Sequence, residues 1–138
     1  MESFQVRTSG RTDLRDITAE VQAAVRRSGL GSGWALVYVP HTTAGITINE
    51  NADPSVIHDL AESLERLAPW EQPFYRHSEG NSAAHIKASL MGSSVSIPVE
   101  RGQLALGQWQ GIFLCEFDGP RTRRVCVQAG ASSRSAAE

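Results

Sequence analysis

Residues 41–54 read His41-Thr-Thr-Ala-Gly-Ile-Thr-Ile-Asn-Glu-Asn-Ala-Asp53-Pro54, and they join an apolar run, residues 34–39, to the start of a helix. Successive side chains of a strand point to opposite faces, so Ile46 and Ile48 would face a core. The polar side chains on the other face would be Thr47, Asn49 and Asn51. A row of polar side chains beside a histidine at a strand end does not suit a hydrophobic core, so this stretch indicates a functional site.

Length and composition predict an ordinary globular chain. The 138 residues fit one domain, 41% of them are hydrophobic and 20% are charged. Thirteen basic residues against fifteen acidic ones give a formal net charge of -2, which offers no overall electrostatic footprint for nucleic acid. No apolar run approaches the roughly 20 residues that span a bilayer, and residues 1–8 lack a signal-peptide layout. We therefore expect a cytoplasmic protein with no membrane or nucleic-acid partner.

Cys115 and Cys126 lie in consecutive apolar segments, which we expect to form a hairpin. A hairpin would allow a disulfide between them. Because the chain shows no secretion signal, two reduced, structural thiols are the better prediction.

The first third predicts a strand, a helix and a second strand. Residues 4–8 alternate as a strand and residues 9–13 form a turn. Asp16 or Thr18 can cap a helix, and glycines at 29, 31 and 33 end it before the strand at 34–39. The apolar positions with helical spacing are Ile17, Val21, Ala24 and Val25.

Asp53-Pro54 is typical of a helix start, with a capping side chain followed by proline at the first helical position. This helix runs to Leu67, and an aromatic-rich loop over residues 68–80 leads to a short helix over residues 83–90. We expect the short helix to bury Ala83, Ile86 and Leu90. Strands follow at 94–99, 104–106, 112–117 and 123–128, the last two as the hairpin. The predicted fold class is α+β: one domain over residues 1–128, mainly antiparallel, with a disordered tail over residues 129–138.

Three histidines, His41, His77 and His85, lie outside the periodic apolar faces of the predicted elements. Histidine is the commonest neutral nitrogen ligand and the usual acid–base residue near pH 7. A zinc site built from these three side chains is chemically sensible, although their spacing matches no local metal motif. The alternative is that each histidine makes a structural hydrogen bond.

Gly80, Asn81 and Ser82 lead into a helix N-terminus, whose free N–H groups favour an anion such as phosphate. Side chains that could add donors or charge are Arg76, His85 and Lys87, and the alternative is an ordinary capped helix.

The oxygen-bearing group Asn49, Glu50, Asn51 and Asp53 suits magnesium bridging to a phosphate, although Asp53 is explained more simply as a helix cap. Trp109 could wall a pocket or pack in the core. The arginines of residues 121–124 could pair with phosphate or solubilise a turn.

Four motifs in this order resemble the YjbQ family of secondary thiamine-phosphate synthase enzymes. They are residues 41–54, Tyr75-Arg-His-Ser-Glu-Gly-Asn-Ser82, His85-Ile-Lys-Ala-Ser89 and Gly107-Gln-Trp-Gln-Gly111. The resemblance runs from about Phe4 to Gln128. It implies an α+β fold with a β-sandwich-like sheet arrangement, two to three helices, a homotrimer, and pockets near subunit boundaries.

The resemblance also implies synthesis of thiamine phosphate from a hydroxymethylpyrimidine diphosphate and a thiazole phosphate, as a main or a side activity. The family's motif positions fall on His41, Asn49, Glu50, Asn51, Asp53, His77, Glu79, His85, Lys87 and Trp109. We assign Lys87, His85 and the backbone of residues 80–82 to the diphosphate. Asn49, Glu50 and Asp53 would serve magnesium, and His41 and His77 proton transfer or a metal.

Two alternatives stay open at this point. One is a metal-dependent hydrolase, or another enzyme acting on a phosphorylated metabolite, that uses His41, His77 and His85. The other is a non-catalytic trimer that binds an anionic metabolite.

Overall fold

Alternating apolar residues build two antiparallel sheets, which the computed structural model describes over residues 1–132. The five-stranded sheet has the order β1 (Glu2–Arg7), β8 (Thr122–Ala131), β3 (Gly33–Tyr38), β5 (Ser94–Glu100), β6 (Gln103–Leu104). The three-stranded sheet has the order β2 (Asp13–Asp16), β7 (Gln110–Glu116), β4 (Ala44–Glu50). The helices of residues 1–132 are α1 (Thr18–Ser28), α2 (Pro54–Leu67) and α3 (Ser82–Met91). The predicted class, α+β with an antiparallel sandwich-like arrangement and two to three helices, is confirmed.

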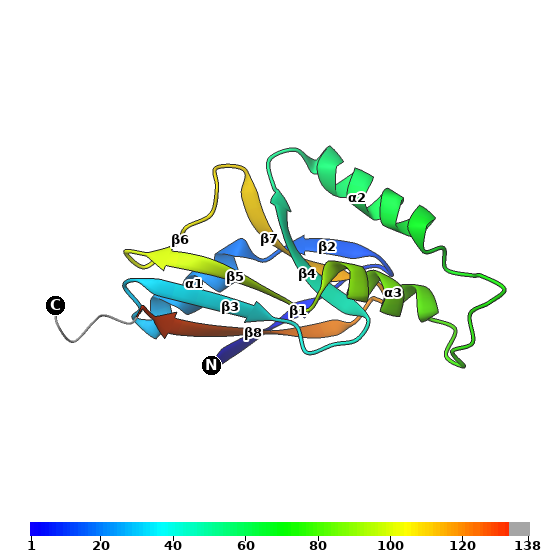
Figure 1. Cartoon of the computed structure of the whole chain (residues 1–138), viewed down its shortest axis with the longest axis horizontal. Helices are drawn as coiled ribbons and strands as arrows, with labels where there is room; N and C mark the ends of the chain where they lie inside the picture. Colours follow the sequence, from blue (N-terminus) through cyan, green and yellow to red (C-terminus); the bar gives the residue numbers. More distant parts are fainter. Residues whose placement is uncertain (133–138) are drawn as a thin grey trace.

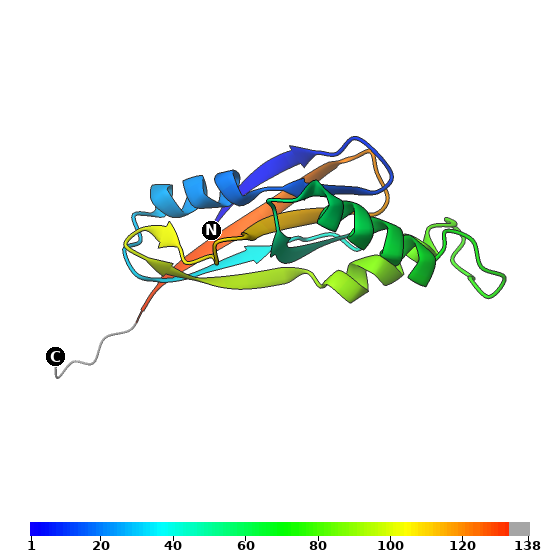
Figure 2. The same ribbon diagram turned by 90° about the horizontal axis from the view of Figure 1, so that it is seen from above.

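The main core lies between the two sheets and α1. Ile46 and Leu114 of the small sheet meet Val37 and Val125 of the large one, all with 0% exposure. The helix α1 packs against β8, the short strand β6 and β7 (Figures 1 and 2). Its predicted apolar positions Ile17, Val21, Ala24 and Val25 are all buried. Ile17 is the N-cap residue of α1, and Asp16 just before it accepts hydrogen bonds from the amide and the hydroxyl of Thr18, the first helical residue.

The other face of the small sheet forms a second core with α3 and α2. Gly45 lets α3 approach β4 closely, because a Cβ there would lie 2.8 Å from the Gly92 oxygen. The helix consequently packs through its small side chains, with Ala84 and Ala88 buried. Our prediction that Ile86 and Leu90 are buried is wrong: these side chains are 39% and 57% exposed.

The helix α2 begins as predicted, with Asp53 accepting from the Ser55 amide and Pro54 in the first turn. This hydrogen bond holds the pKa of Asp53 below its ordinary value. Across residues 54–67, all of which the structure describes, Leu64 alone is buried. An ion pair between Glu65 and the buried Lys87 also ties α2 to α3. No helix within residues 1–132 is long and apolar enough to cross a membrane.

The last two long strands do not form the predicted hairpin. The strand β7 pairs with β2 and β4, whereas β8 pairs with β1 and β3 in the other sheet. The turn between them carries the chain from one sheet to the other. Cys115 and Cys126, both described, are free and buried, and burial raises the pKa of Cys115 to about 12.

Two boundaries also differ from the sequence prediction. The strand β2 lies where we expected the end of a turn. The strand β8 continues to Ala131, so residues 129–131 pair with β3 instead of belonging to a disordered tail. Residues 133–138 of the predicted tail lie outside the described residues.

A buried ion pair joins the two sheets. Glu116, at the end of β7, has 0% side-chain exposure, and it pairs with Arg123 of β8, whose side chain is 5% exposed. Glu116 also accepts from the Thr8 hydroxyl at 2.8 Å and from the Asp118 amide at 3.0 Å. Arg123 donates to the Thr43 hydroxyl at 2.8 Å. The carboxylate therefore has donors for its lone pairs, which a buried charge requires.

We predict that Arg123→Ala lowers the free energy of unfolding by about 3–5 kcal/mol, because it leaves the Glu116 charge buried without its partner. Arg124→Ala is the matched control: this neighbouring side chain is exposed, and we expect a change within about 0.5 kcal/mol. Urea denaturation followed by circular dichroism measures both variants. Equal stability of the two would contradict the prediction.

Candidate functional site

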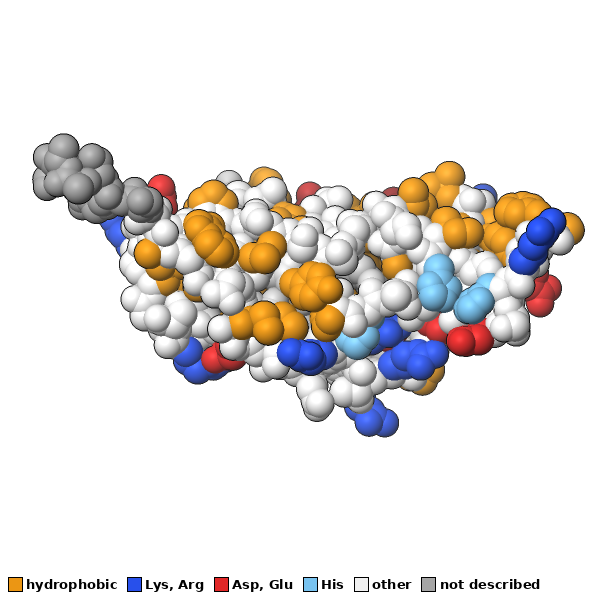
Figure 3. Space-filling model, turned by 60° about the horizontal axis from the view of Figure 1, so that its bottom comes forward, with side chains coloured by type: hydrophobic (Ala, Val, Ile, Leu, Met, Phe, Trp, Pro, Cys, Tyr) orange, Lys and Arg blue, Asp and Glu red, His pale blue; other side chains and the backbone are white. Residues whose placement is uncertain are grey.

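A polar cavity of about 470 Å³ lies beside the Glu116–Arg123 pair. The connection between β3 and β4 supplies His41, the loop before α3 supplies His77 and Asn81, and α3 itself supplies His85. The other lining residues are Pro40, Thr42, Thr43, Glu79, Asp118, Arg121 and Arg123. Figure 3 shows histidine side chains gathered toward one end of the molecule, beside basic and acidic side chains. Segments far apart in the sequence thus meet at one site, which we call the histidine cavity.

The ring of His41 is held in one orientation. Its Nε2 accepts a hydrogen bond from the Arg124 backbone amide at 2.9 Å. An accepting nitrogen is unprotonated, so the proton of the neutral ring lies on Nδ1, which is then a donor. Burial lowers the pKa of His41, and the nearby Arg123 cation lowers it further, while Glu116 opposes them. His41 is therefore neutral at pH 7.

His77 and His85 touch each other edge to face, with ring centroids 5.1 Å apart and an interplanar angle of 86°. His85 is half-buried and also lines two hollows that neighbour the histidine cavity. A ligand in any of the three spaces would meet this side chain. His85 is accordingly the central side chain of the site.

Asn81 connects the cavity to the turn between β7 and β8. Its Nδ2 donates to Asp118 at 2.9 Å, and Arg121 donates to the same carboxylate oxygen at 3.0 Å. A carboxylate can only accept, which fixes the orientation of the Asn81 amide. The Asn81 side-chain oxygen is buried and finds no hydrogen-bond partner among residues 1–132. Asn81 also precedes α3, so the free amides of the first helical turn begin at this point.

The structure separates the remaining sequence-predicted residues from the histidine cavity. Asn49, Glu50, Asn51 and Asp53 lie at the far end of β4, which at about 3.3 Å per residue is roughly 20 Å from its start. There Asn49 accepts from the Glu50 amide, Glu50 accepts from the Asp53 amide and Asn51 donates to Asp16. Trp109 belongs to the same end, since its carbonyl accepts from the Asn51 amide.

Three further predicted residues border the cavity rather than line it. Lys87 is 2% exposed and points its amine at Glu65. Ser82 lines the neighbouring hollow. Gly80 is exposed and adopts the left-handed conformation, with φ of 73°, that favours glycine.

Sequence reasoning missed Thr43, Asp118 and the buried Glu116. Thr43 was part of the quoted stretch, but nothing marked it as a partner of an arginine 80 positions further along the chain. The signal for Arg121 and Arg123 was present in the cluster of arginines after Gly119-Pro120, where the sequence left phosphate pairing and solubility both open.

The donors of the histidine cavity suit an anion. Arg121 and Arg123 are paired with Asp118 and Glu116, but each guanidinium keeps further N–H groups that can donate. The His41 N–H can donate as well, and a helix N-terminus opens beside these groups. A metal fits less well, since His41 would have to release the Arg124 amide or lose its Nδ1 proton. Within residues 1–132, no group of three or more histidine, cysteine, aspartate or glutamate residues is arranged to hold a metal ion.

The fold and this cavity define a class of small sandwich proteins with a polar site beside the sheet-to-sheet connections. A family model described as UPF0047 protein YjbQ-like matches residues 2–132. The UPF0047 protein YugU of Bacillus subtilis is 54% identical over 128 residues, covering 93% of this chain and 97% of that protein. A UPF0047 protein of Methanocaldococcus jannaschii is 53% identical over 125 residues, covering 91% and 90%.

Solved protein structures show the same fold. A YjbQ/UPF0047 family protein from Clostridium acetobutylicum superposes with a TM-score of 0.91 at 53% identity, covering 94% of this chain and 99% of that one. A conserved hypothetical protein from Thermus thermophilus gives 0.87 at 45% identity, covering 94% and 99%. The chain therefore belongs to the YjbQ (UPF0047) family, as the four sequence motifs indicated.

We predict that the imidazole of His41 titrates with a midpoint below 6.5, because burial and Arg123 disfavour its charged form. A pKa that is lower in the folded than in the unfolded state means that the unfolded chain binds more protons, so stability falls as the pH drops below 6.5. Proton NMR of the histidine ring resonances, assigned with His41→Gln, measures the midpoint. A midpoint at or above 6.5 would refute this account of the His41 environment.

Proposed function

We propose that this protein is an enzyme acting on phosphorylated small molecules, and that its histidine cavity holds the phosphate. One observation carries the proposal: three histidines, two arginines and the start of α3 converge on a single open cavity. Histidines can donate and accept protons near pH 7, and arginines and helix amides stabilise the charge of a phosphate. The same side chains on a surface without a hollow would support no such role.

The particular reaction that we propose is the formation of thiamine phosphate. The thiazole nitrogen would attack the methylene carbon of the hydroxymethylpyrimidine diphosphate, forming the carbon–nitrogen bond. The carbon–oxygen bond would break, and diphosphate would leave with its electron pair. This chemistry depends on stabilising the leaving charge more than on a protein nucleophile. Family resemblance supports the substrates, and the donors of the cavity support the class of chemistry.

The geometry favours a division of roles that differs in part from the sequence assignment. Arg121 and the His41 N–H would bind the diphosphate, with Gly80, Asn81 and Ser82 providing the helix start. His77 or His85, when protonated, would donate a proton to the departing diphosphate oxygen. Lys87 takes no place in this scheme, because its amine is committed to Glu65. The remaining sequence-predicted residues also take no place in this scheme, because they lie near the end of β4 that is far from the histidine cavity. They are Asn49, Glu50, Asn51, Asp53 and Trp109.

A divalent-metal enzyme that uses His41, His77 and His85 is the second candidate, and what supports it is that all three line one cavity. Zinc would polarise a phosphate and activate water there. A non-catalytic binding protein for an anionic metabolite is the third candidate. A cytoplasmic location and a metabolite partner, without nucleic acid, stay predictions of the sequence.

We predict that the purified protein forms thiamine phosphate from the two substrates and that His85→Ala lowers kcat/KM by about 100-fold or more, the usual effect of losing an acid–base residue. His58→Ala is the matched control, because this histidine is exposed on α2 and lines none of the cavities described above. Product formation followed by mass spectrometry measures both variants. Equal rates for His85→Ala and the unmodified protein would rule out this role for His85.

The same preparations distinguish the three candidates. Elemental mass spectrometry of the untagged protein, compared with a His41→Ala, His85→Ala double variant, reports a bound metal. About one zinc per chain that is lost in the variant would favour the metal-dependent enzyme. Turnover without a tightly bound transition metal favours the transferase. Phosphate binding without any turnover favours the binding protein.

We also propose that the protein is a homotrimer, assembled through the outer face of the five-stranded sheet. Trp34 and Tyr38 of β3 are each 43% exposed on this face, and Figure 3 shows apolar side chains gathered over one side of the molecule. Exposed apolar patches of this kind are typical of subunit interfaces.

We predict that light scattering gives three times the mass of the chain and that Tyr38→Glu converts the trimer into monomers, because burying an unpaired charge is costly. Trp109→Glu is the matched control, since Trp109 is 57% exposed at the end of the small sheet. A monomeric unmodified protein would reject the trimer. A trimeric Tyr38→Glu variant would reject this face as the interface.

A further inference from the structure

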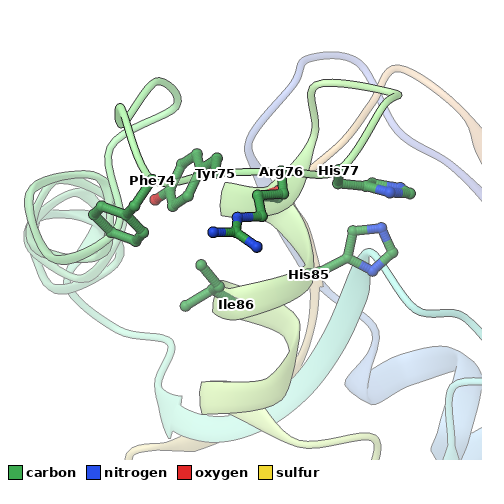
Figure 4. Close-up of a pocket in the computed structure, with 7 residues that line it drawn as sticks. Phe74, Tyr75, Arg76, His77, His85 and Ile86 are labelled. Atoms are coloured by element: carbon green, nitrogen blue, oxygen red, sulfur yellow. The ribbon is translucent and has the colours of Figure 1, made fainter.

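An apolar groove lies beside the histidine cavity, between the loop before α3 and α3 itself. It has a volume of about 520 Å³, and its residues besides the two histidines are Phe74, Tyr75, Arg76, Ser82 and Ile86. Figure 4 shows the aromatic loop residues on one side, Ile86 of α3 below and the two histidines on the other side. His77 and His85 line both the groove and the histidine cavity, so the two spaces are neighbours with these two side chains at their border.

The walls of the groove are held in place by internal contacts. Phe74 and Tyr75 meet edge to face, with ring centroids 5.0 Å apart. The Tyr75 hydroxyl donates to the Pro69 carbonyl at 2.9 Å, which fixes the ring that supports Phe74. Ile86 projects from α3 because the close packing of that helix on Gly45 uses its alanine face. The packing of α3 therefore leaves an apolar floor beside the site.

Phe74 and Ile86 stay 70% and 39% exposed, so the groove offers apolar surface that the folding of this chain does not cover. The Arg76 side chain extends over it, between Phe74 and Tyr75 on one side and His77 on the other (Figure 4). None of the ion pairs within residues 1–132 involves Arg76. A guanidinium above an apolar slot can stack on the face of an aromatic ring.

We propose that this groove is a binding subsite for a planar aromatic ring, and that Phe74, Ile86 and Arg76 determine which ring the site accepts. The inference rests on the proposed function, because the phosphate in the histidine cavity would anchor the ring beside it. A ligand of this site is then an ester of phosphate or diphosphate with an aromatic group. Its ring lies between Phe74 and Ile86, and its charge lies past His77 and His85.

The test compares three probes, inorganic phosphate, phenyl phosphate and phenol, by NMR titration of the isotope-labelled full chain. Burial of the ring predicts that phenyl phosphate binds roughly tenfold more tightly than inorganic phosphate. Phe74→Ala and Ile86→Ala should each remove most of this gain and leave the affinity for inorganic phosphate unchanged. Leu90→Ala is the matched control: it is 57% exposed on the same helix and does not line the groove.

Each outcome decides one of the two proposals. Equal affinities for phenyl phosphate and inorganic phosphate, or a gain that survives in both Phe74→Ala and Ile86→Ala, would overturn the ring subsite and leave the phosphate site intact. Failure of inorganic phosphate to shift the resonances of His41 and His85 would overturn the phosphate site. The ring subsite would still stand if phenol shifted the Ile86 amide and Phe74→Ala abolished that shift. If none of the probes bound, both proposals would be wrong.

Discussion

The buried pair of Glu116 and Arg123 lies where three connections carry the chain between the two sheets. Thr8 begins the connection from β1 to β2, Thr43 ends the one from β3 to β4, and Glu116 and Arg123 flank the one from β7 to β8. Backbone hydrogen bonds join these connections directly, from Thr8 to Arg121 at 2.8 Å and from Phe117 to Thr43 at 3.2 Å. One buried carboxylate thus organises the end of the sandwich at which the site lies. His41, two residues before Thr43, takes its position from this arrangement.

Local chemistry made parts of the fold predictable from the sequence. Asp53 and Pro54 start a helix through interactions with their nearest neighbours, and the apolar spacing from Ile17 to Val25 needs one buried face. The site was harder, because strand geometry separates residues that are close in sequence. Asn49 and His41 are eight positions apart, yet an extended strand carries them to opposite ends of a sheet. The histidines were found because none of the three belongs to a periodic apolar face, although His85 lies within α3.

The wrong predictions share a physical cause, which is a contact between distant parts of the chain. Nothing near Ile86 in sequence shows that Gly45 will draw the alanine face of α3 onto β4. Nothing near Cys115 shows that the following turn crosses to another sheet rather than doubling back within its own. Charged side chains such as Glu116 and Arg123 usually lie on the surface, so the sequence gives no sign that these two are buried. They are buried because they form an ion pair with each other.

The two sides of the site rest on very different amounts of buried structure. Hydrogen bonds tie His41 to the Arg124 amide in β8 and Asn81 to Asp118 in the connection between β7 and β8. The helix α2, which leads into the loop of Phe74 and His77, has Leu64 as its one buried residue within 54–67. Segments with so few buried contacts undergo local unfolding at a small fraction of the global free energy. Hydrogen exchange should therefore be slow in the strands that hold His41 and faster in α2, so the loop after α2 depends on its own contacts for its shape.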